Sequence, residues 1–197
     1  MRYEVRRVPG EATLADAYAV RRAVFIEEQG VSEAEEMDGL DEQSIHFVAY
    51  AVGSNGDPPS RADGDEDEGS EEGAGGDEDE EPSSRADEDE AEGSEEGVGG
   101  ASAERAGQPV GTARLRIPEP GVAKPERVAV LESHRGEGVG RQLMAAIERE
   151  AREQGCERAR LHAQVAVEAF YRDLGYETTS GVFEEADIPH VEMEKEL

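Results

Sequence analysis

The sequence predicts a mixed α/β fold, in which helices and one sheet form layers. Residues 45–52 alternate between two sets of side chains, and this period of two is typical of a strand. Residues 139–154 carry apolar side chains at every fourth position, which is typical of an amphipathic helix. From residue 126 onward, strand-like and helix-like segments alternate, and this order favours a mixed sheet.

The first part of the chain predicts a strand, a helix and a hairpin. Residues 3–8 read as a short opening strand. A helix follows, for which Thr13 provides a capping-box-like start and Gly30 a stop. A polar, acidic stretch then leads to the strand at 45–52, and residues 110–117 read as the second strand of a β-hairpin.

The second part of the chain predicts three strands and two helices. The helices are stopped by Gly155 and Gly175, and their apolar residues recur at spacings of three and four. We expect strands at 126–131, 158–164 and 191–197, and helices at 139–154 and 167–174.

The charge composition limits the possible partners and location. With 49 acidic and 20 basic residues, the net charge of -29 argues against nucleic acid and membrane partners, which are bound through basic patches. Only Lys124 and Lys195 are lysines, so we interpret the chain as coming from a halophilic archaeon; an acidic protein from an ordinary host is the alternative. The single cysteine, Cys156, and the lack of an apolar signal segment predict a cytoplasmic protein.

Residues 53–107 form an acidic, low-complexity insert. They hold 21 acidic residues and three arginines, and residues 60–76 return almost unchanged at 84–100. A segment with so few apolar residues cannot offset its ordering entropy, so we expect it to be disordered. Its position predicts a hairpin turn stretched within one domain that spans residues 1–197. It serves either as an inert solvated loop or as a docking site for a basic partner or divalent cations.

The segment HRGEGVGRQL, residues 134–143, lies between a predicted strand and a predicted helix. Glycines at Gly136, Gly138 and Gly140 leave backbone N–H groups accessible at a helix N-terminus, an arrangement typical of anion binding. A tight turn would use the same glycines. A P-loop is excluded because Arg141, and not lysine, follows the last glycine, and the spacing also differs from the dinucleotide fingerprint.

The glycine loop and a later segment together resemble the GNAT acetyltransferase superfamily. RGEGVG, residues 135–140, is similar to the Arg/Gln-x-x-Gly-x-Gly/Ala loop that holds the acetyl-CoA pyrophosphate in that family. AFYRDLGY, residues 169–176, is similar to its later signature, and RRAVFIEEQGV, residues 21–31, resembles the ElaA-like branch. The resemblance covers nearly all of the chain outside the insert. It implies a mostly antiparallel sheet, splayed at the CoA site, with helices on both faces.

The resemblance also implies a mechanism, in which an amine attacks the acetyl-CoA thioester directly in a ternary complex. The pantetheine arm pairs like an added strand with the backbone of residues 128–130, and the N–H of Val130 stabilises the oxyanion. Tyr171 protonates the departing thiolate, although its spacing alone also fits a core aromatic. The expected cofactor-binding residues are Val128, Ala129, Val130, Arg135, Gly136, Glu137, Gly138, Val139, Gly140 and Arg141. No metal is expected, and the side chain of Glu137 should point to solvent.

The proton acceptor for the amine is open among four residues, each of which also fits a structural or solvated role. They are Glu28, Asp41, His46 and His162. Glu28 leads, because it lies within the ElaA-like segment.

The function implied is an N-acetyltransferase acting on a primary amine, of a small molecule or of a protein. Two other classes stay open: a non-catalytic acyl-CoA sensor, and an acidic interaction protein that works through its insert. Tyr171 favours the enzyme. The acidic surface suggests a cationic acceptor, although adaptation to salt explains the same charge. The oligomeric state, monomer or homodimer, is open.

Overall fold

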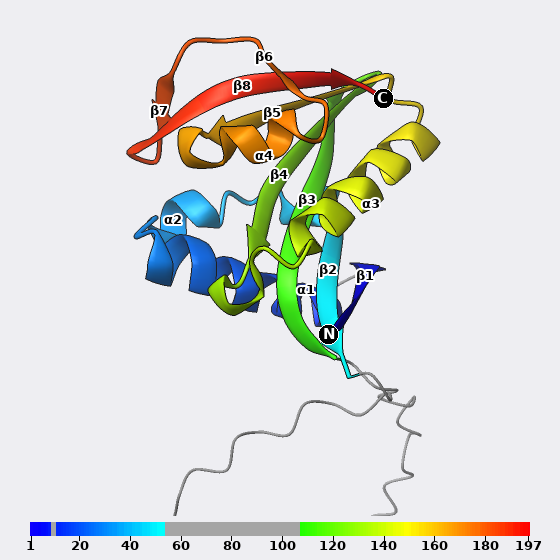
Figure 1. Ribbon diagram of the computed structural model, residues 1–197, viewed down its shortest axis with the longest axis vertical. Coiled ribbons are helices and arrows are strands. Elements are labelled where there is room, and N and C mark those ends of the chain that lie inside the picture. Colours follow the sequence, from blue (N-terminus) through cyan, green and yellow to red (C-terminus); the bar gives the residue numbers. More distant parts are fainter. Residues whose placement is uncertain (9–10, 54–106) are drawn as a thin grey trace, which may run out of the picture. The chain divides into compact units, whose positions relative to one another are not determined.

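The computed structural model describes residues 1–8, 11–53 and 107–197, and Figure 1 traces them along the sequence. Apart from its two end residues, the predicted insert lies outside the described residues. The strands are β1 (Arg2–Val8), β2 (Ile45–Val52), β3 (Gln108–Glu119), β4 (Val122–Val130), β5 (Arg158–Gln164), β6 (Glu177–Thr178), β7 (Phe183–Glu185) and β8 (Ile188–Glu196). The α-helices are α1 (Glu11–Arg21), α2 (Glu33–Glu36), α3 (Val139–Glu153) and α4 (Glu168–Arg172). A π-helical segment, η1 (Arg22–Glu28), extends α1, and short 3₁₀ turns are η2 (Asp41–Gln43), η3 (Glu132–His134) and η4 (Val165–Val167).

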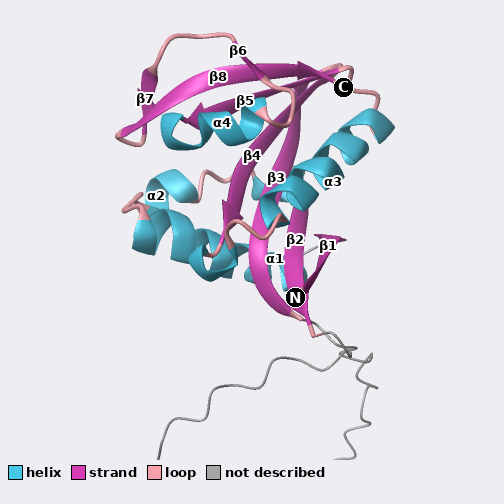
Figure 2. Ribbon diagram, viewed as in Figure 1, coloured by secondary structure: helices cyan, strands magenta, loops and turns pink. Residues whose placement is uncertain are grey.

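The strands of the described residues form one sheet in the order β1-β2-β3-β4-β5-β8-β6, with β7 paired to β8. All neighbours are antiparallel except β4 and β5, which are parallel and pair only at Val122–Arg158 and Ala123–Ala159. Beyond these pairs the two strands diverge, and Figure 2 shows β5 and β8 turning away from β4. The mostly antiparallel, splayed sheet predicted from the family resemblance is therefore confirmed.

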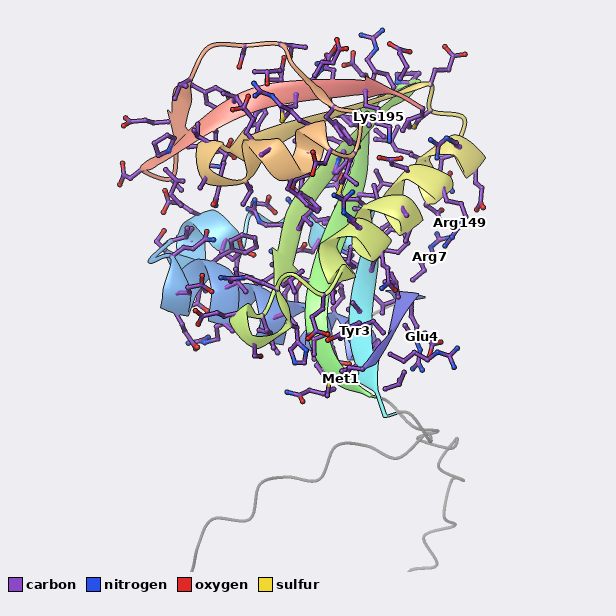
Figure 3. All side chains as sticks on the ribbon, in the orientation of Figure 1. Met1, Tyr3, Glu4, Arg7, Arg149 and Lys195 are labelled. Atoms are coloured by element: carbon purple, nitrogen blue, oxygen red, sulfur yellow. The ribbon has the colours of Figure 1, made fainter. Side chains whose placement is uncertain are left out.

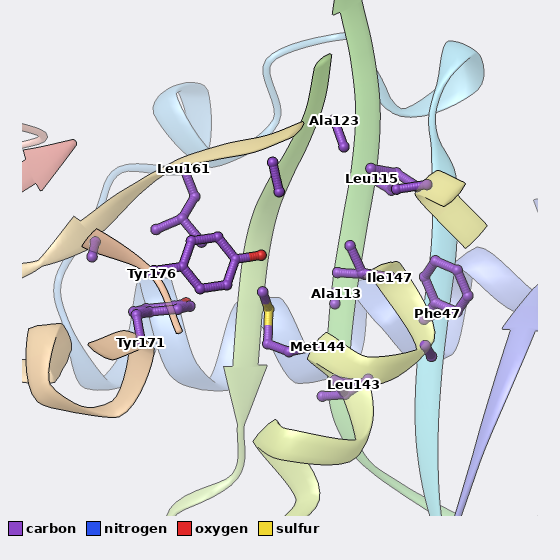
Figure 4. Packing of buried hydrophobic residues seen from close by; sticks show 14 of the residues in the cluster. Phe47, Ala113, Leu115, Ala123, Leu143, Met144, Ile147, Leu161, Tyr171 and Tyr176 are labelled. Carbon is purple, nitrogen blue, oxygen red and sulfur yellow. The ribbon is translucent and has the colours of Figure 1, made fainter. Parts of the chain in front are cut away.

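Helices cover both faces of the sheet, as predicted. On one face Phe47 of β2 belongs to the main core with Leu143 of α3, and on the other Val48 packs in a cluster with Ala17 of α1. Figure 4 shows Leu143, Met144 and Ile147 of α3 beside Phe47, Ala113 and Leu115. The alternating pattern of β2 thus separates two buried faces, and does not separate core from solvent.

Two local features differ from the sequence-based expectation. Helix α1 begins at Glu11, so Thr13 lies inside the helix and the predicted start at Thr13 is wrong. The helix then continues through η1 to Glu28.

Strands β7 and β8 form an unexpected hairpin, whose turn residues Ala186 and Asp187 have φ of 51° and 58°. Because neither is glycine, the usual signal for such a turn is absent.

The acidic stretch before β2 folds against buried arginines. Asp41 accepts hydrogen bonds from Arg21 at 2.7 Å and from Arg114 at 3.0 Å. Arg114 also binds Asp38 at 2.6 Å and Glu126 at 2.7 Å, and both arginines are only 1% exposed. We call this set the arginine–carboxylate cluster; it comprises Arg21, Glu36, Asp38, Asp41, Arg114, Glu126 and Arg127. The cluster ties the α1–α2 layer to β3 and β4.

Acid should destabilise the fold through this cluster. Hydrogen bonding from Arg114 holds the pKa of Asp38 well below its ordinary value. Burial raises the pKa of Glu126, but the charge and hydrogen bond of Arg114 outweigh this effect, so the pKa of Glu126 is also lowered. Such carboxylates stabilise the fold above their unfolded pKa, near pH 4, and lose that contribution as pH falls. We expect the free energy of unfolding in urea to drop between about pH 5 and pH 1.

The Asp38→Asn variant should show a shallower drop, and an equally steep profile in this variant would contradict the assignment. Glu36 acts in the opposite direction, because burial raises its pKa despite the nearby Arg21, so its protonation offsets part of the loss.

Candidate active site

A pocket of about 870 Å³ opens where β4 and β5 diverge. Its walls come from η1, α2, β4, the loop before α3, β5, α4 and the β7–β8 turn. Of the predicted site residues it is lined by Val128, Ala129, Val130, Arg135, Gly136, Gly138, Val139, Gly140, Arg141 and Tyr171. Glu28 and Glu137 are not among the lining residues.

Strand β4 presents to this pocket a backbone edge that pairs with no described strand beyond Ala123. The N–H of Leu131 donates to the carbonyl of Val110 at 2.9 Å, so Leu131 faces β3. Successive residues of a strand direct their backbone groups to opposite sides, so Val130 faces away from β3. The Arg135 Nε, donating to the Val130 carbonyl at 3.0 Å, marks that side. Since β5 pairs only with Val122 and Ala123, an extended amide chain can add here as a strand.

A β-bulge just before this edge turns β4 away from β5. The register with β3 shifts between Thr112 and Arg114, where β4 supplies one extra residue, and Arg127 has a φ of 52°. A positive φ is uncommon for a residue other than glycine, and a bulge bends its strand. The Arg127 guanidinium pairs with the Glu36 carboxylate at 2.8 Å and donates to the Glu35 carbonyl at 3.0 Å. Helix α2 therefore holds the bulge.

The glycine loop leads into the N-terminus of α3. Gly136 and Gly138 have φ of 78° and 83°, and a Cβ at either would meet open space, so both serve the backbone conformation. The N–H groups of the first turn after Gly138 have no partners within the helix, which favours an anion there. Gly140 differs, because a Cβ would lie 3.2 Å from the Phe170 ring. The N–H of Arg135, in contrast, already has a partner, because it donates to the Glu132 carbonyl at 3.2 Å.

The charged side chains of the loop have partners outside the pocket. Arg135 makes two contacts with Glu28, at 2.8 and 2.5 Å. Glu137 accepts a hydrogen bond from the hydroxyl of Tyr3 at 2.9 Å; Tyr3 is labelled on β1 in Figure 3. Arg141 lies 3.2 Å from Asp173. Glu137 is exposed, as the sequence predicts, and its carboxylate does not enter the pocket.

Tyr171 of α4 combines burial with access to the pocket. Its ring makes edge contacts with Phe170 and Tyr176, at 5.0 and 6.0 Å between centroids, and Figure 4 shows the two tyrosines beside each other. Burial raises the pKa of the Tyr171 phenol, so the hydroxyl keeps its proton at neutral pH. Such a group can donate a proton to a thiolate.

The structure places the four candidate proton acceptors in different surroundings. Asp41 and His46 lie in the buried layer between α1 and the sheet, and neither lines the pocket. Glu28 hydrogen-bonds Arg135, which lowers the pKa of its carboxyl, so the geometry favours a role in holding that arginine. The assignment of Glu28 as the base stays a prediction. His162 alone of the four lines the pocket.

Sequence reasoning missed several residues of the pocket. Gln164 at the end of β5 donates to Gln29 at the end of η1 at 2.9 Å. Phe170 packs against Gly140, and Arg127 holds the bulge. These contacts join segments far apart in the chain, so no local spacing indicates them; only the AFYRDLGY motif pointed to the neighbourhood of Phe170.

The sheet thus opens between two parallel strands, beside a glycine loop at a helix N-terminus. Residues 66–197 match the acetyltransferase (GNAT) domain, and the chain belongs to this family. It is 31% identical to YyaT, an uncharacterized protein of Bacillus subtilis, over 98% of this chain and 95% of that protein. It is also 31% identical to YjcF, an uncharacterized N-acetyltransferase of the same organism, over 94% of each chain.

Solved structures share the fold. ElaA of Escherichia coli superposes with a TM-score of 0.62 at 20% identity, over 99% of both chains. An acyl-CoA N-acyltransferase of Pseudomonas aeruginosa gives 0.61 at 20% identity, over 98% of both. The protein is thus a GNAT-family acyltransferase, a family that uses acyl-CoA and an amine acceptor. Within the described ranges, no helix is long and apolar enough to cross a bilayer.

Proposed function

We propose that the protein transfers the acetyl group of acetyl-CoA to a primary amine by direct attack in a ternary complex. One observation carries the proposal: three features converge on the same pocket. They are the β4 edge at Val130, the N-terminus of α3 at Gly138, and Tyr171, which carries a hydroxyl. Each matches one part of an acyl-CoA thioester: the amide arm, the phosphates and the sulfur.

The residues divide the work as follows. The β4 edge at residues 128–130 orients the pantetheine arm, and the N–H of Val130 stabilises the oxyanion that forms on the thioester carbonyl. The first turn of α3, from Gly138, binds the phosphates through its N–H groups. Tyr171 gives its proton to the sulfur as the carbon–sulfur bond breaks. Holding both substrates in one pocket converts a bimolecular reaction into an effectively unimolecular one.

The other expectations about the chain stay predictions. They comprise a halophilic origin, a cytoplasmic location, the single domain interrupted by residues 53–107, and the absence of nucleic-acid, membrane and metal partners. Tyr171, which lines the pocket and carries a hydroxyl, favours turnover over a purely sensory role.

Gly138→Glu should weaken acetyl-CoA binding more than about tenfold, because like charges placed side by side at a binding site cost several kcal/mol. The measurement is calorimetric titration with acetyl-CoA in high salt. Gly121→Glu is the matched control: Gly121 also has a positive φ, 81°, with open space around it, and it lies in the β3–β4 turn outside the pocket. Both variants carry the same strain and the same charge.

Binding that disappears in Gly138→Glu and persists in Gly121→Glu supports the proposed site. Absence of binding in a folded parent protein, or equal loss in the two variants, would overturn it.

A further inference from the structure

We infer, on the basis of the proposed function, that His162 held by Glu185 is the proton acceptor for the attacking amine. His162 lies on the opposite face of β5 from the core that includes Tyr171, because Leu161 and Ala163, its neighbours, point into that core. A base and an acid on opposite sides of the thioester suit a reaction in which the amine arrives from one side and the thiol departs on the other.

The β7–β8 hairpin brings the carboxylate to the imidazole. Strand β8 pairs with β5 on one side and with β7 on the other, so both residues meet over β8. The Nδ1 of His162 lies 2.7 Å from Glu185 Oε2, and the Phe183 ring contacts the imidazole edge-on at 5.0 Å between centroids. A carboxylate at Nδ1 favours the tautomer in which Nδ1 carries the proton, and this leaves the lone pair of Nε2 to accept one.

Two carboxylates lie beside the His162 imidazole. Glu185 of β7 and Glu192 of β8 lie 2.7 and 3.9 Å from the ring nitrogens. Lys124 of β4 shares the cavity walls with His162, but its Nζ pairs with Glu126 at 3.1 Å. Further charged or titratable groups in the cavity walls, or paired with them, include Glu35 and Glu36 of α2, Arg116 and Glu119 of β3, Arg127 of β4, Arg160 of β5, and His190 and Glu194 of β8. Arg116 pairs with Glu126, and Arg160 with Glu194, so their charges are compensated.

A second cavity beside His162 is the entrance that we assign to the amine. It measures about 220 Å³, and it shares only Lys124 and His162 with the main pocket. An acceptor that enters through this cavity passes His162 before it reaches the β4 edge, while acyl-CoA occupies the opening beside α3. The two substrates therefore need not compete for one path.

The proton transfers balance. Nε2 of His162 takes one proton from the ammonium group and passes it to water, and the freed nitrogen lone pair forms a bond to the thioester carbon. When the carbon–sulfur bond breaks, the thiolate takes the Tyr171 proton, and the second amine proton leaves to solvent, from which Tyr171 is reprotonated. The products are the amide, free CoA thiol and one released proton.

His162→Gln should lower kcat by about 100-fold with primary alkyl amines as probes, as expected for the loss of a general base. Acetyl-CoA affinity, measured by calorimetry, should stay unchanged, and the limb of the pH–rate profile that reports the base should be lost. The loss should be smaller with an arylamine probe, which is already unprotonated at neutral pH. Glu185→Gln should act in the same direction, whereas Glu184→Gln, an exposed neighbour on β7, should change nothing.

Nitrogen NMR of ¹⁵N-histidine-labelled protein with acetyl-CoA bound gives a readout that needs no acceptor. The inference predicts a proton on Nδ1 of His162 and a shift of the tautomer balance in Glu185→Gln. A proton on Nε2, an unchanged pH profile in His162→Gln, or loss of acetyl-CoA binding in that variant would overturn it. If the parent protein itself fails to bind acetyl-CoA, the proposed function fails first, and the two failures are thereby distinguished.

Discussion

Replacing Arg114 with methionine should lower the free energy of unfolding by about 3–5 kcal/mol, the typical cost of removing one partner of a buried ion pair. Arg114 is 1% exposed and contacts three carboxylates, of Asp38, Asp41 and Glu126. Methionine keeps much of the apolar volume, so the loss reports the charge and not a cavity. Urea unfolding at pH 7 measures it.

Arg160→Met is the control for this experiment. Arg160 also pairs with a carboxylate, Glu194 at 2.8 Å, but the two side chains are 35% and 26% exposed, and solvent weakens such a pair. Similar losses of unfolding free energy in the two variants would mean that the cluster around Arg114 stabilises the fold no more than a partly exposed ion pair does. A large loss that is confined to Arg114→Met, and that shrinks toward pH 3 as the carboxylates become protonated, would support it.

Tyr171→Phe should lower kcat by about 100- to 1000-fold, because general acid catalysis typically contributes in this range. The affinity for acetyl-CoA should change little, since the ring stays in its contacts with Phe170 and Tyr176. Release of free CoA thiol in the presence of a primary amine measures kcat, and calorimetry measures binding. A loss in kcat without a loss in affinity identifies an interaction made in the transition state.

Tyr176→Phe provides the matched control, because Tyr176 is also a buried tyrosine with a raised pKa but does not line the pocket. It should keep the parental kcat. If Tyr171→Phe also kept it, Tyr171 would be a core aromatic only, as its helical spacing alone allows.

The features that could be predicted from sequence are those that depend on nearby residues. Strand 158–164 agrees with β5 in both bounds, because alternation of small apolar and polar residues is a local property. The position of the glycine loop before α3 could be predicted in the same way, since the glycines and the helix that follows them occupy one short segment; its binding of an anion stays a prediction. Tyr171 required more: its spacing indicated a core position, and only the family resemblance assigned it a chemical role.

The features that could not be predicted depend on contacts between distant segments. Nothing near Arg127 in the sequence indicates a positive φ, because the residues that hold it, Glu35 and Glu36, lie in another layer. The carboxylates of Asp38 and Asp41 read as a polar stretch, since their arginine partners on α1 and β3 are remote in the chain. The pairing of His162 with Glu185 likewise depends on a hairpin whose turn lacks glycine.

The edge of β4 that lacks a neighbouring strand is a risk for aggregation as well as a proposed binding position. An exposed strand edge is a template on which the strand of another molecule can grow, and this is a common start of aggregation. Here the edge lies between η1 on one side and α4 on the other, and the bulge at Arg127 bends it. Such a bend disfavours pairing with a flat strand from a neighbouring chain. The same bend thus disfavours edge-to-edge pairing at the position where we propose that the pantetheine arm binds.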